Sequence, residues 1–412
     1  MMRAVEVLLG GRLIGSLAED DHERWQFRFS KAYRRLNDRP LLGQFFEDDL
    51  RGTYRGKKGA LPPYFANLIP ETSGELRPLL EAQLEIARGD DITLLERLGR
   101  DLPGAVEVRQ IAELPHEHAV GLDDGIGPTE PSERDEEWIR FSLAGFQLKF
   151  SVLLAKEKIT LPMHGSRGDW LIKLDSERFP GLCANEHAVM LWAKTAGFTV
   201  PEIRLMPSSA LLGKLGEYAE PDTYVLAVKR YDREPQGKIH QEDFAQVANL
   251  SPEHKYDQKT YEWIARIASA CVGGSAANEI IRRLVLMIAS GNVDAHLKNW
   301  SFIYPDGIRA ELSPLYDQVA TVAWPQLKRK LALKFAGVKE LSKIGREDFS
   351  RLADRARFPR EEVLAVVNRT LGELAEAWKS VSKSPEWSMS PAHMKALHEH
   401  WQRTPLLREV FS

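Results

Sequence analysis

Residues 280–299, IIRRLVLMIASGNVDAHLKN, join a strongly apolar run to a loop rich in polar side chains. The apolar run predicts a helix over 278–290, and Gly291 is suited to end it, because glycine readily adopts the left-handed conformation. The polar side chains of the loop are Asp294, His296, Lys298 and Asn299. The sequence therefore predicts a polar loop that is held on a buried helix.

A polar loop of this kind can be a metal site, a plain turn or a catalytic loop. A zinc site would require His and Cys, or paired His, at recognised spacing, and Asp294 and His296 lack an obvious third ligand nearby. A plain polar turn is always available after a helix. A catalytic loop is the third possibility, and the loop by itself leaves the turn and the catalytic loop open.

The segment after the loop favours phosphoryl transfer. Two short strand patterns joined by the turn sequence PDG (305–307) lead to Asp317. Phosphoryl transfer needs one carboxylate to accept a hydroxyl proton, and amide and carboxylate oxygens to hold Mg²⁺. Asp294 and Asn299 have the spacing of the kinase pattern H-R-D-x-x-x-x-N. Asp317 would then take the place of the metal-binding Asp of D-F-G, and Lys298 could neutralise charge on the transferred phosphate.

A kinase also needs a strand lysine and a loop that covers the phosphates. Lys173 lies mid-strand in WLIKLD (170–175), where a charge is costly unless an anion pairs with it. Glu186 in the next predicted helix could orient it, although the helix dipole explains a glutamate there equally well. The stretch SLAGFQLKF (142–150) has one glycine and matches neither G-x-G-x-x-G nor a Walker A motif. It is therefore also compatible with an ordinary hairpin.

The chain of 412 residues is too long for one ordinary core, so two or three substructures are expected. Residues 4–17 predict a hairpin with a Gly-Gly turn, and short helices are predicted over 75–88 and 92–99. Residues 112–137 are rich in Pro, Gly and acidic side chains and are the predicted linker or mobile loop. The predicted domains are an α+β domain (1–111), this linker, a sheet-containing lobe (138–234) and a helical lobe (235–412).

Strands are predicted for 138–145, 146–155, 169–175 and 223–232, and helices dominate beyond residue 243. Asn185 is the expected N-cap of a helix predicted over 186–196, and Gly197 is suited to end that helix. The predicted helices are 186–196, 243–249, 259–272, 278–290, 346–356, 360–381 and 391–402.

Composition excludes several classes of protein. Hydrophobic residues make up 43% and charged residues 28%, and no apolar run approaches the roughly 20 residues that span a bilayer. Glu6 interrupts the apolar N-terminus, so we expect no signal peptide. A net charge of -3 gives no support for autonomous nucleic-acid binding, and the basic run LKRKLALK (327–334) is expected to be a solvated face. Cys183 and Cys271 are expected to be buried free thiols in a reducing cytosol.

Six segments resemble, in order, those of HipA-family serine/threonine kinases, the toxins of bacterial type II toxin-antitoxin systems. The segments are SLAGFQLKF (142–150), LIKL followed by NEHAV (171–189), VKRYDR (228–233), HQEDFAQ (240–246), GNVDAHLKNWSF (291–302) and LSPLYDQVA (312–320). The N-terminal stretches VLLGGRLIGSL (7–17) and YFANLIPE (64–71) are similar to the small N-terminal domain of HipA. The resemblance covers nearly the whole chain and is weakest beyond about residue 340.

The resemblance implies an α+β, bilobal, protein-kinase-like fold with a HipA-type N-terminal domain, a nucleotide-binding lobe and a helical catalytic lobe. It implies Asp294 as the catalytic base, Asn299 and Asp317 as Mg²⁺ ligands, and Ser142 as a site of autophosphorylation. In the family that modification ejects the phosphate loop and inactivates the kinase. The implied nucleotide-binding residues are Ala144, Gly145, Phe146, Gln147, Leu148 and Lys149 in the phosphate loop, Lys173, then Lys229, Arg230 and Tyr231 in the hinge, His296, Leu297, Lys298 and Asn299 in the catalytic loop, and Tyr316 and Asp317.

The resemblance also implies ATP and Mg²⁺ as cofactors and a cytoplasmic location. Its implied partners are a small helix-turn-helix antitoxin similar to HipB, DNA only through that antitoxin, and an aminoacyl-tRNA synthetase as substrate, whose phosphorylation blocks translation. Two alternatives stay open: a kinase of the same fold that acts on a small molecule, and a mainly non-enzymatic corepressor. The bulky Phe146 and Phe150 depart from the family pattern and leave the resting position of the phosphate loop open.

Overall fold

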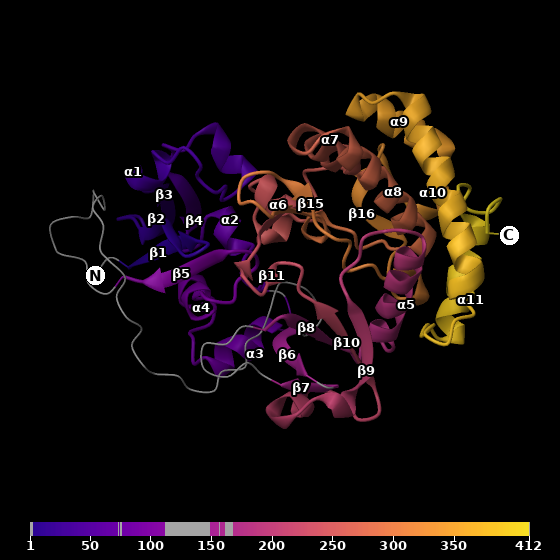
Figure 1. Cartoon of the computed structure of the whole chain (residues 1–412), viewed down its shortest axis with the longest axis horizontal. Coiled ribbons are helices and arrows are strands. Elements are labelled where there is room, and N and C mark those ends of the chain that lie inside the picture. The colour runs from indigo at the N-terminus through magenta and orange to yellow at the C-terminus, as the bar shows by residue number, and fades with distance from the viewer. Residues whose placement is uncertain are drawn as a thin grey trace. The chain divides into compact units, whose positions relative to one another are not determined.

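The computed structural model of the chain describes residues 3–72, 74, 76–111, 149–155, 157–160 and 168–411 (Figure 1). The predicted linker 112–137 and the predicted strand 138–145 lie outside the described residues. Within the described part, no helix is both long and apolar enough to cross a membrane.

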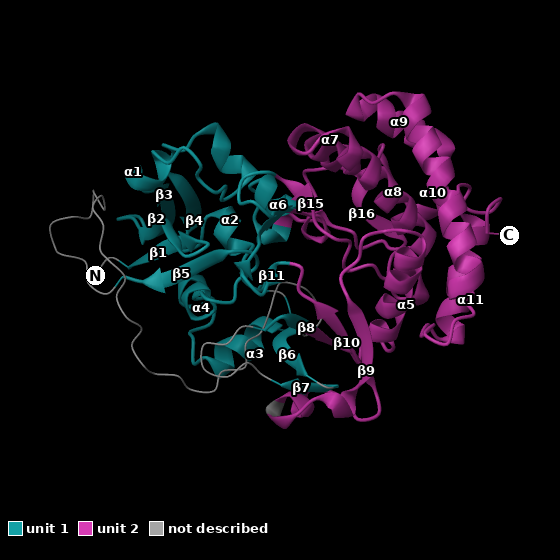
Figure 2. Cartoon of the chain, in the orientation of Figure 1, with its two compact units in different colours: residues 1–171, 232–253, 303–309 teal, residues 172–231, 254–302, 310–412 magenta. Residues whose placement is uncertain are grey.

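Contacts divide the chain into two compact units, each built from three segments (Figure 2). Unit 1 comprises residues 1–171, 232–253 and 303–309, and unit 2 comprises residues 172–231, 254–302 and 310–412. Each unit contains both helices and strands, which agrees with the predicted α+β class. The predicted domains are continuous ranges of sequence, whereas each unit combines separate segments, and the predicted domain boundaries stay predictions.

Unit 1 combines short helices with several small groups of strands. Its elements are β1 (Ala4–Leu9), β2 (Arg12–Glu19), β3 (Arg24–Phe29), α1 (Lys31–Arg34), β4 (Tyr54–Lys58), α2 (Pro63–Ala66), α3 (Leu76–Gln83), α4 (Asp91–Arg97), β5 (Val106–Gln110), β6 (Lys149–Ala155), β7 (Lys158–Thr160), β11 (Arg233–Glu234), β12 (Gly237–Lys238), β13 (His240–Asp243) and α6 (Phe244–Val247).

The five-stranded sheet of unit 1 has the order β4-β3-β2-β1-β5 and is antiparallel throughout. The predicted N-terminal hairpin is confirmed: Leu9 pairs with Arg12 across Gly10 and Gly11, whose φ angles are +57° and +79°. A two-residue turn with both φ angles positive matches the right-handed twist of the strands. The helix predicted over 75–88 ends earlier, because Glu85 adopts a φ of +53° that no right-handed helix can contain.

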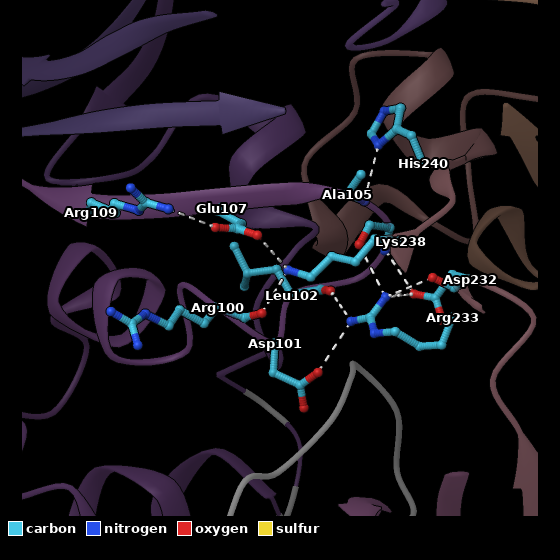
Figure 3. Close-up of polar contacts among 11 residues, drawn as sticks. Arg100, Asp101, Leu102, Ala105, Glu107, Arg109, Asp232, Arg233, Lys238 and His240 are labelled. Atoms are coloured by element: carbon cyan, nitrogen blue, oxygen red, sulfur yellow. Dashed lines mark hydrogen bonds and ion pairs between the residues drawn. The ribbon is translucent and has the colours of Figure 1, made fainter. Parts of the chain in front are cut away.

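A buried charge network explains why the segment after residue 231 packs into unit 1 (Figure 3). The Arg233 guanidinium contacts the Asp101 carboxylate at 3.1 Å and donates to the Leu102 carbonyl at 2.9 Å. Asp232 accepts from the Gly104 backbone N–H at 2.8 Å. These charges are buried and would be costly without partners, so the loop before β5 and the segment that leads into β11 stabilise one another.

Glu242 in β13 is a fully buried acid. One carboxylate oxygen accepts from the Tyr304 hydroxyl and, at 2.9 Å, from the Gln44 backbone N–H. Its other oxygen has no hydrogen-bond partner among the described residues. Burial therefore raises the pKa of Glu242 to about 8, although its two hydrogen bonds act in the opposite direction.

We expect the free energy of unfolding to fall between pH 6.5 and pH 8 because of Glu242. In this window the folded state retains a proton that the unfolded state has lost, so each rise in pH favours unfolding, by up to about 1.4 kcal/mol per pH unit. Burial lowers the pKa of His240 to about 4. Below pH 6.5 this histidine therefore makes the free energy of unfolding rise with pH, which opposes the effect of Glu242. Urea unfolding at several pH values should show that the free energy of unfolding of Glu242→Gln falls less steeply with pH than that of wild type. The exposed Glu253→Gln is the control, and equal slopes for both variants and wild type would reject this assignment.

Unit 2 contains the long helices. Its elements are α5 (Leu182–Thr195), β9 (Ile203–Pro207), β10 (Tyr224–Lys229), α7 (Tyr261–Cys271), α8 (Gly274–Ser290), β15 (Glu311–Leu312), β16 (Lys330–Phe335), β17 (Val338–Glu340), α9 (Arg346–Ala356), α10 (Arg360–Val381) and α11 (Pro391–Arg403), while β8 (Trp170–Leu174) and β14 (Ser301–Tyr304) cross the unit boundaries.

The predicted helices of unit 2 are confirmed: α9 and α10 have the predicted bounds, and the ends of the others differ from the predicted ends by a few residues. Helix α10 packs along both α5 and α8 (Figure 1). Tryptophan side chains bond the helices to one another: Trp192 of α5 donates to the Leu374 carbonyl of α10 at 2.9 Å, and Trp401 of α11 donates to the Ala289 carbonyl of α8 at 2.7 Å. A buried indole N–H needs such a partner, which makes the packing specific. The basic run 327–334 presents its lysines and its arginine to solvent, as predicted.

The prediction of Asn185 as an N-cap is wrong. Helix α5 begins at Leu182, and its N-cap is Gly181, with a φ of +73°. Asp175 satisfies the helix N-terminus instead, since its carboxylate accepts from the Gly181 N–H at 3.1 Å and the Cys183 N–H at 2.7 Å. Asn185 lies inside the helix and is fully buried. Both cysteines are free thiols as predicted, but only Cys183 is buried and Cys271 is partly exposed.

Candidate active site

The polar loop of residues 291–299 starts from a rigid helix end. Gly291 closes α8 with a φ of +70°, and its N–H donates to the Ile288 carbonyl at 3.1 Å. A Cβ atom at this position would lie 2.5 Å from Cγ2 of Val322. Both the conformation and the space therefore require glycine, which confirms the predicted helix end.

The loop is bonded to the segment that carries Asp317. The Thr321 hydroxyl accepts from the Val293 N–H at 2.8 Å and donates to the Gly291 carbonyl at 2.8 Å. The Asn292 side chain accepts from the Asp294 N–H at 3.0 Å. The two Thr321 bonds join the first residues of the loop to the segment after Asp317, so two acidic segments, far apart in sequence, lie in one region of unit 2.

Lys173 in β8 lies between two carboxylates. Its ammonium group contacts Glu186 in α5 and Asp317, and the side chains of Lys173 and Glu186 are almost fully buried. Burial alone would lower the pKa of Lys173, but the charges of Asp317 and Glu186 outweigh it and raise the pKa above its ordinary value. Lys173 is therefore held as a cation, and Asp175, two residues further along, fixes the strand to the start of the helix that carries Glu186.

Asn299 and Asp317 lie side by side. The Asn299 amide donates to a carboxylate oxygen of Asp317 at 3.3 Å, and its own oxygen accepts from the His296 backbone N–H at 3.1 Å. An amide oxygen has a second lone pair, so Asn299 can still bind a cation. Asp317 adopts a φ of +52°, which Asp tolerates better than most residues.

The donor set of this pair fits Mg²⁺. Mg²⁺ prefers oxygen ligands and usually takes one or two carboxylates together with water and substrate phosphates. Asn299 and Asp317 supply an amide and a carboxylate oxygen within reach of each other. Among the described residues, no group of three or more His, Cys, Asp or Glu side chains is arranged to hold a metal ion. One amide and one carboxylate leave further coordination positions for water and substrate phosphates, so the pair fits a cation that a substrate helps to hold.

Asp294 points its carboxylate to the protein surface. It is exposed, and its Oδ1 accepts from the Tyr256 hydroxyl at 2.8 Å. The Tyr256 ring packs edge-on against the His296 ring, with centroids 5.1 Å apart. An exposed, oriented carboxylate is accessible to a hydroxyl group of another molecule.

His296 is the buried member of the loop. Burial, together with the charges of Lys255 and Lys298, holds its pKa well below the ordinary value, so the imidazole is neutral. Its Nδ1 atom is buried and has no hydrogen-bond partner among the described residues. A buried polar atom without a partner is unfavourable, which is consistent with a site that a ligand completes. Leu297 is fully buried and acts as a core residue.

The remaining predicted site residues divide into four groups. The Tyr316 hydroxyl donates to the Lys298 carbonyl at 3.0 Å, so Tyr316 borders the loop, and the ring centroid of Tyr231 lies 5.8 Å from that of Tyr316. Arg230 is buried, whereas Lys229 is exposed, with its ammonium 4.0 Å from Glu202. Lys149 is buried at the start of β6 in unit 1. The predicted autophosphorylation site and the predicted phosphate-loop residues outside the described part are Ser142, Ala144, Gly145, Phe146, Gln147 and Leu148.

Sequence reasoning missed several residues that shape this region. Tyr256 and Thr321 contact the loop from positions about 30 or more residues away, and no local pattern singles them out. Asp175 follows a strand and precedes a helix start, which is a usable signal for a helix-capping role. Asn292 stands within the loop itself, next to the glycine.

Comparison with known families covers both halves of the chain. The HipA N-terminal domain matches residues 5–109, and the HipA-like C-terminal domain matches residues 141–378. The chain belongs to the HipA family. The predicted family resemblance is thereby confirmed.

Relatives of this HipA-family chain extend over most of its length. The Sinorhizobium fredii protein Y4dM, provisionally named as a kinase, is 35% identical over 388 residues and covers 92% of each chain. A second provisional kinase of that organism, Y4mE, is 30% identical and covers 86% of each. The serine/threonine-protein kinase toxin HipA of Shewanella oneidensis is 24% identical and covers 90% of this chain and 88% of its own.

A solved structure shares the fold. HipA of Shewanella oneidensis, in its complex with HipB and operator DNA, superposes with a TM-score of 0.73 at 19% identity, and the match covers 96% of this chain and 94% of that one. The predicted HipA-like, kinase-like α+β fold is confirmed.

Proposed function

We propose that this HipA-family chain is an ATP- and Mg²⁺-dependent protein serine/threonine kinase. The observation that carries the proposal is the cluster in which Lys173 contacts Glu186 and Asp317 while Asn299 lies beside Asp317. A buried cation fixed by two carboxylates, next to an amide and carboxylate pair that fits Mg²⁺, is the equipment that phosphoryl transfer from ATP requires.

In the proposed reaction, the hydroxyl oxygen of a substrate serine or threonine attacks the γ-phosphorus of ATP, and Asp294 accepts the proton of that hydroxyl. The bond from that phosphorus to the bridging oxygen breaks, and ADP leaves with the electron pair. Lys173 would pair with the phosphates, and Asn299 and Asp317 would hold Mg²⁺, which when bound neutralises phosphate charge. Tyr256 orients the carboxylate of Asp294 through the hydrogen bond at 2.8 Å.

The biological role proposed for the chain is that of a cytoplasmic toxin in a toxin-antitoxin module. The relative from Shewanella oneidensis is named as a kinase toxin, and its structure contains HipB and operator DNA, which supports a small helix-turn-helix antitoxin as partner here and DNA contact through it. We propose an aminoacyl-tRNA synthetase as substrate and Ser142 as an inactivating autophosphorylation site. A phosphate adds about 1.5 to 2 negative charges, which would repel the loop from a triphosphate site.

The test is to incubate the purified chain with ATP, Mg²⁺ and a bacterial lysate, and to map every new phosphoserine and phosphothreonine by mass spectrometry. We expect phosphate on a lysate protein and on Ser142, in both cases dependent on Mg²⁺. A parallel incubation with Asp294→Asn is the control. The same phosphorylated positions with both proteins would reject the proposed activity.

A further inference from the structure

Asn185 is a fully buried amide that makes hydrogen bonds on both of its sides. Its oxygen accepts from the Ala320 backbone N–H at 2.8 Å. Its nitrogen lies 3.3 Å from Nδ1 of His393 in α11. Since an amide NH₂ only donates, the histidine nitrogen must accept. Asn185 therefore links α11 to the segment that follows Asp317.

The Ala320 contact is close to the candidate metal pair. Ala320 is fully buried and lies three residues after Asp317. The same segment is held from the other side by Thr321, which bonds to the Gly291 and Val293 backbones. Without Asn185, the Ala320 N–H would lose its partner inside the protein, which is unfavourable enough to move the segment.

The residue next to Asn185 is also connected to Asp317. Glu186 follows Asn185 in α5 and contacts Lys173, which in turn contacts Asp317. Two consecutive residues of one helix thus reach the segment 317–320 by separate routes, one through a charge and one through a backbone bond. The helix position and the position of Asp317 are coupled by both.

Helix α11 supports the amide from its other side. The His393 ring packs against Trp324 with centroids 4.8 Å apart, and its backbone N–H is capped by the Ser390 hydroxyl at 3.2 Å. These contacts fix the imidazole that receives the Asn185 amide, so Asn185 has one orientation in which its oxygen faces Ala320.

We infer that Asn185 is a positioning residue that holds the segment 317–320 so that Asp317 can bind Mg²⁺ together with nucleotide. This role rests on the proposed kinase function and deepens it. Loss of the Asn185 bond reduces the fraction of molecules in which Asp317 is correctly placed, and the apparent affinity for Mg²⁺ and nucleotide falls by that fraction.

The test is calorimetric binding of a non-hydrolysable ATP analogue over a range of Mg²⁺ concentrations. Asn185→Leu keeps a similar volume and removes both bonds, and we expect it to need about 10-fold more Mg²⁺ for half-saturation. The control is His187→Leu, because His187 lies on the same helix and bonds instead to the Ser388 hydroxyl at 2.9 Å. It should lower the thermal midpoint but leave the Mg²⁺ requirement unchanged.

A second variant covers the case in which Asn185→Leu does not fold. His393→Phe keeps a ring against Trp324 and removes only the acceptor of the Asn185 amide, and a smaller rise in the Mg²⁺ requirement, about 2- to 3-fold, is expected. If wild type binds nucleotide with Mg²⁺ and both variants have the wild-type Mg²⁺ requirement, the positioning role is rejected. If wild type shows no Mg²⁺-dependent binding, the proposed kinase function is rejected, and this role with it.

Discussion

Replacement of Asp294 by Asn is expected to slow phosphoryl transfer by about 10²- to 10⁴-fold, the usual contribution of a general base. An amide cannot accept the hydroxyl proton at neutral pH. Its oxygen can still accept from the Tyr256 hydroxyl, which lies 2.8 Å from Oδ1 of Asp294, so the loop should keep its conformation. The measurement is the initial rate of transfer from labelled ATP, with nucleotide binding followed separately by calorimetry.

The control for Asp294→Asn is Asp354→Asn, which alters an exposed carboxylate of α9 that pairs with Arg360. That variant should retain the wild-type rate, because its carboxylate lies outside the candidate site. If Asp294→Asn kept a rate within about tenfold of wild type, Asp294 would not be the general base.

Much of the scaffold of this site follows from local sequence patterns. The apolar run before Gly291 predicts the helix that ends at the loop, and the helix predicted over 360–381 is found with those bounds. Such segments are long and periodic, so local preference and burial agree. The five-residue spacing of Asp294 and Asn299 and the strand position of Lys173 also singled out residues of the candidate site.

Long-range contacts are the part that local patterns did not predict. Asn185 has the preference of an N-cap, yet Asp175 serves the helix start and Asn185 is used inside the protein, where it bonds to a backbone group 135 residues away. Tyr256 likewise reaches Asp294 across 38 residues. Tertiary hydrogen bonds of this kind override local preference, and only the folded chain reveals them. The roles assigned to Ser142 and to the phosphate loop before Lys149 stay predictions.

Lys173→Met is expected to lower the free energy of unfolding by about 3–5 kcal/mol, because breaking a buried ion pair leaves an uncompensated charge inside the protein. The affected charges are Glu186, which is 2% exposed, and Asp317, which also faces Asn299. Urea unfolding monitors the loss. The matched control is Lys379→Met, whose ion pair with Glu376 is exposed on α10, and which should change stability by about 0.5 kcal/mol or less.

A second substitution separates stability from activity at this cluster. Lys173→Met combined with Glu186→Gln removes the more deeply buried of the two charges that the single variant leaves behind, so it should recover at least about half of the lost stability. It should not recover ATP-dependent transfer, because the cation proposed to pair with the phosphates is still missing. Full stability in Lys173→Met would show that Glu186 and Asp317 do not depend on this lysine. Restored transfer in the double variant would show that Lys173 serves the fold and not the reaction.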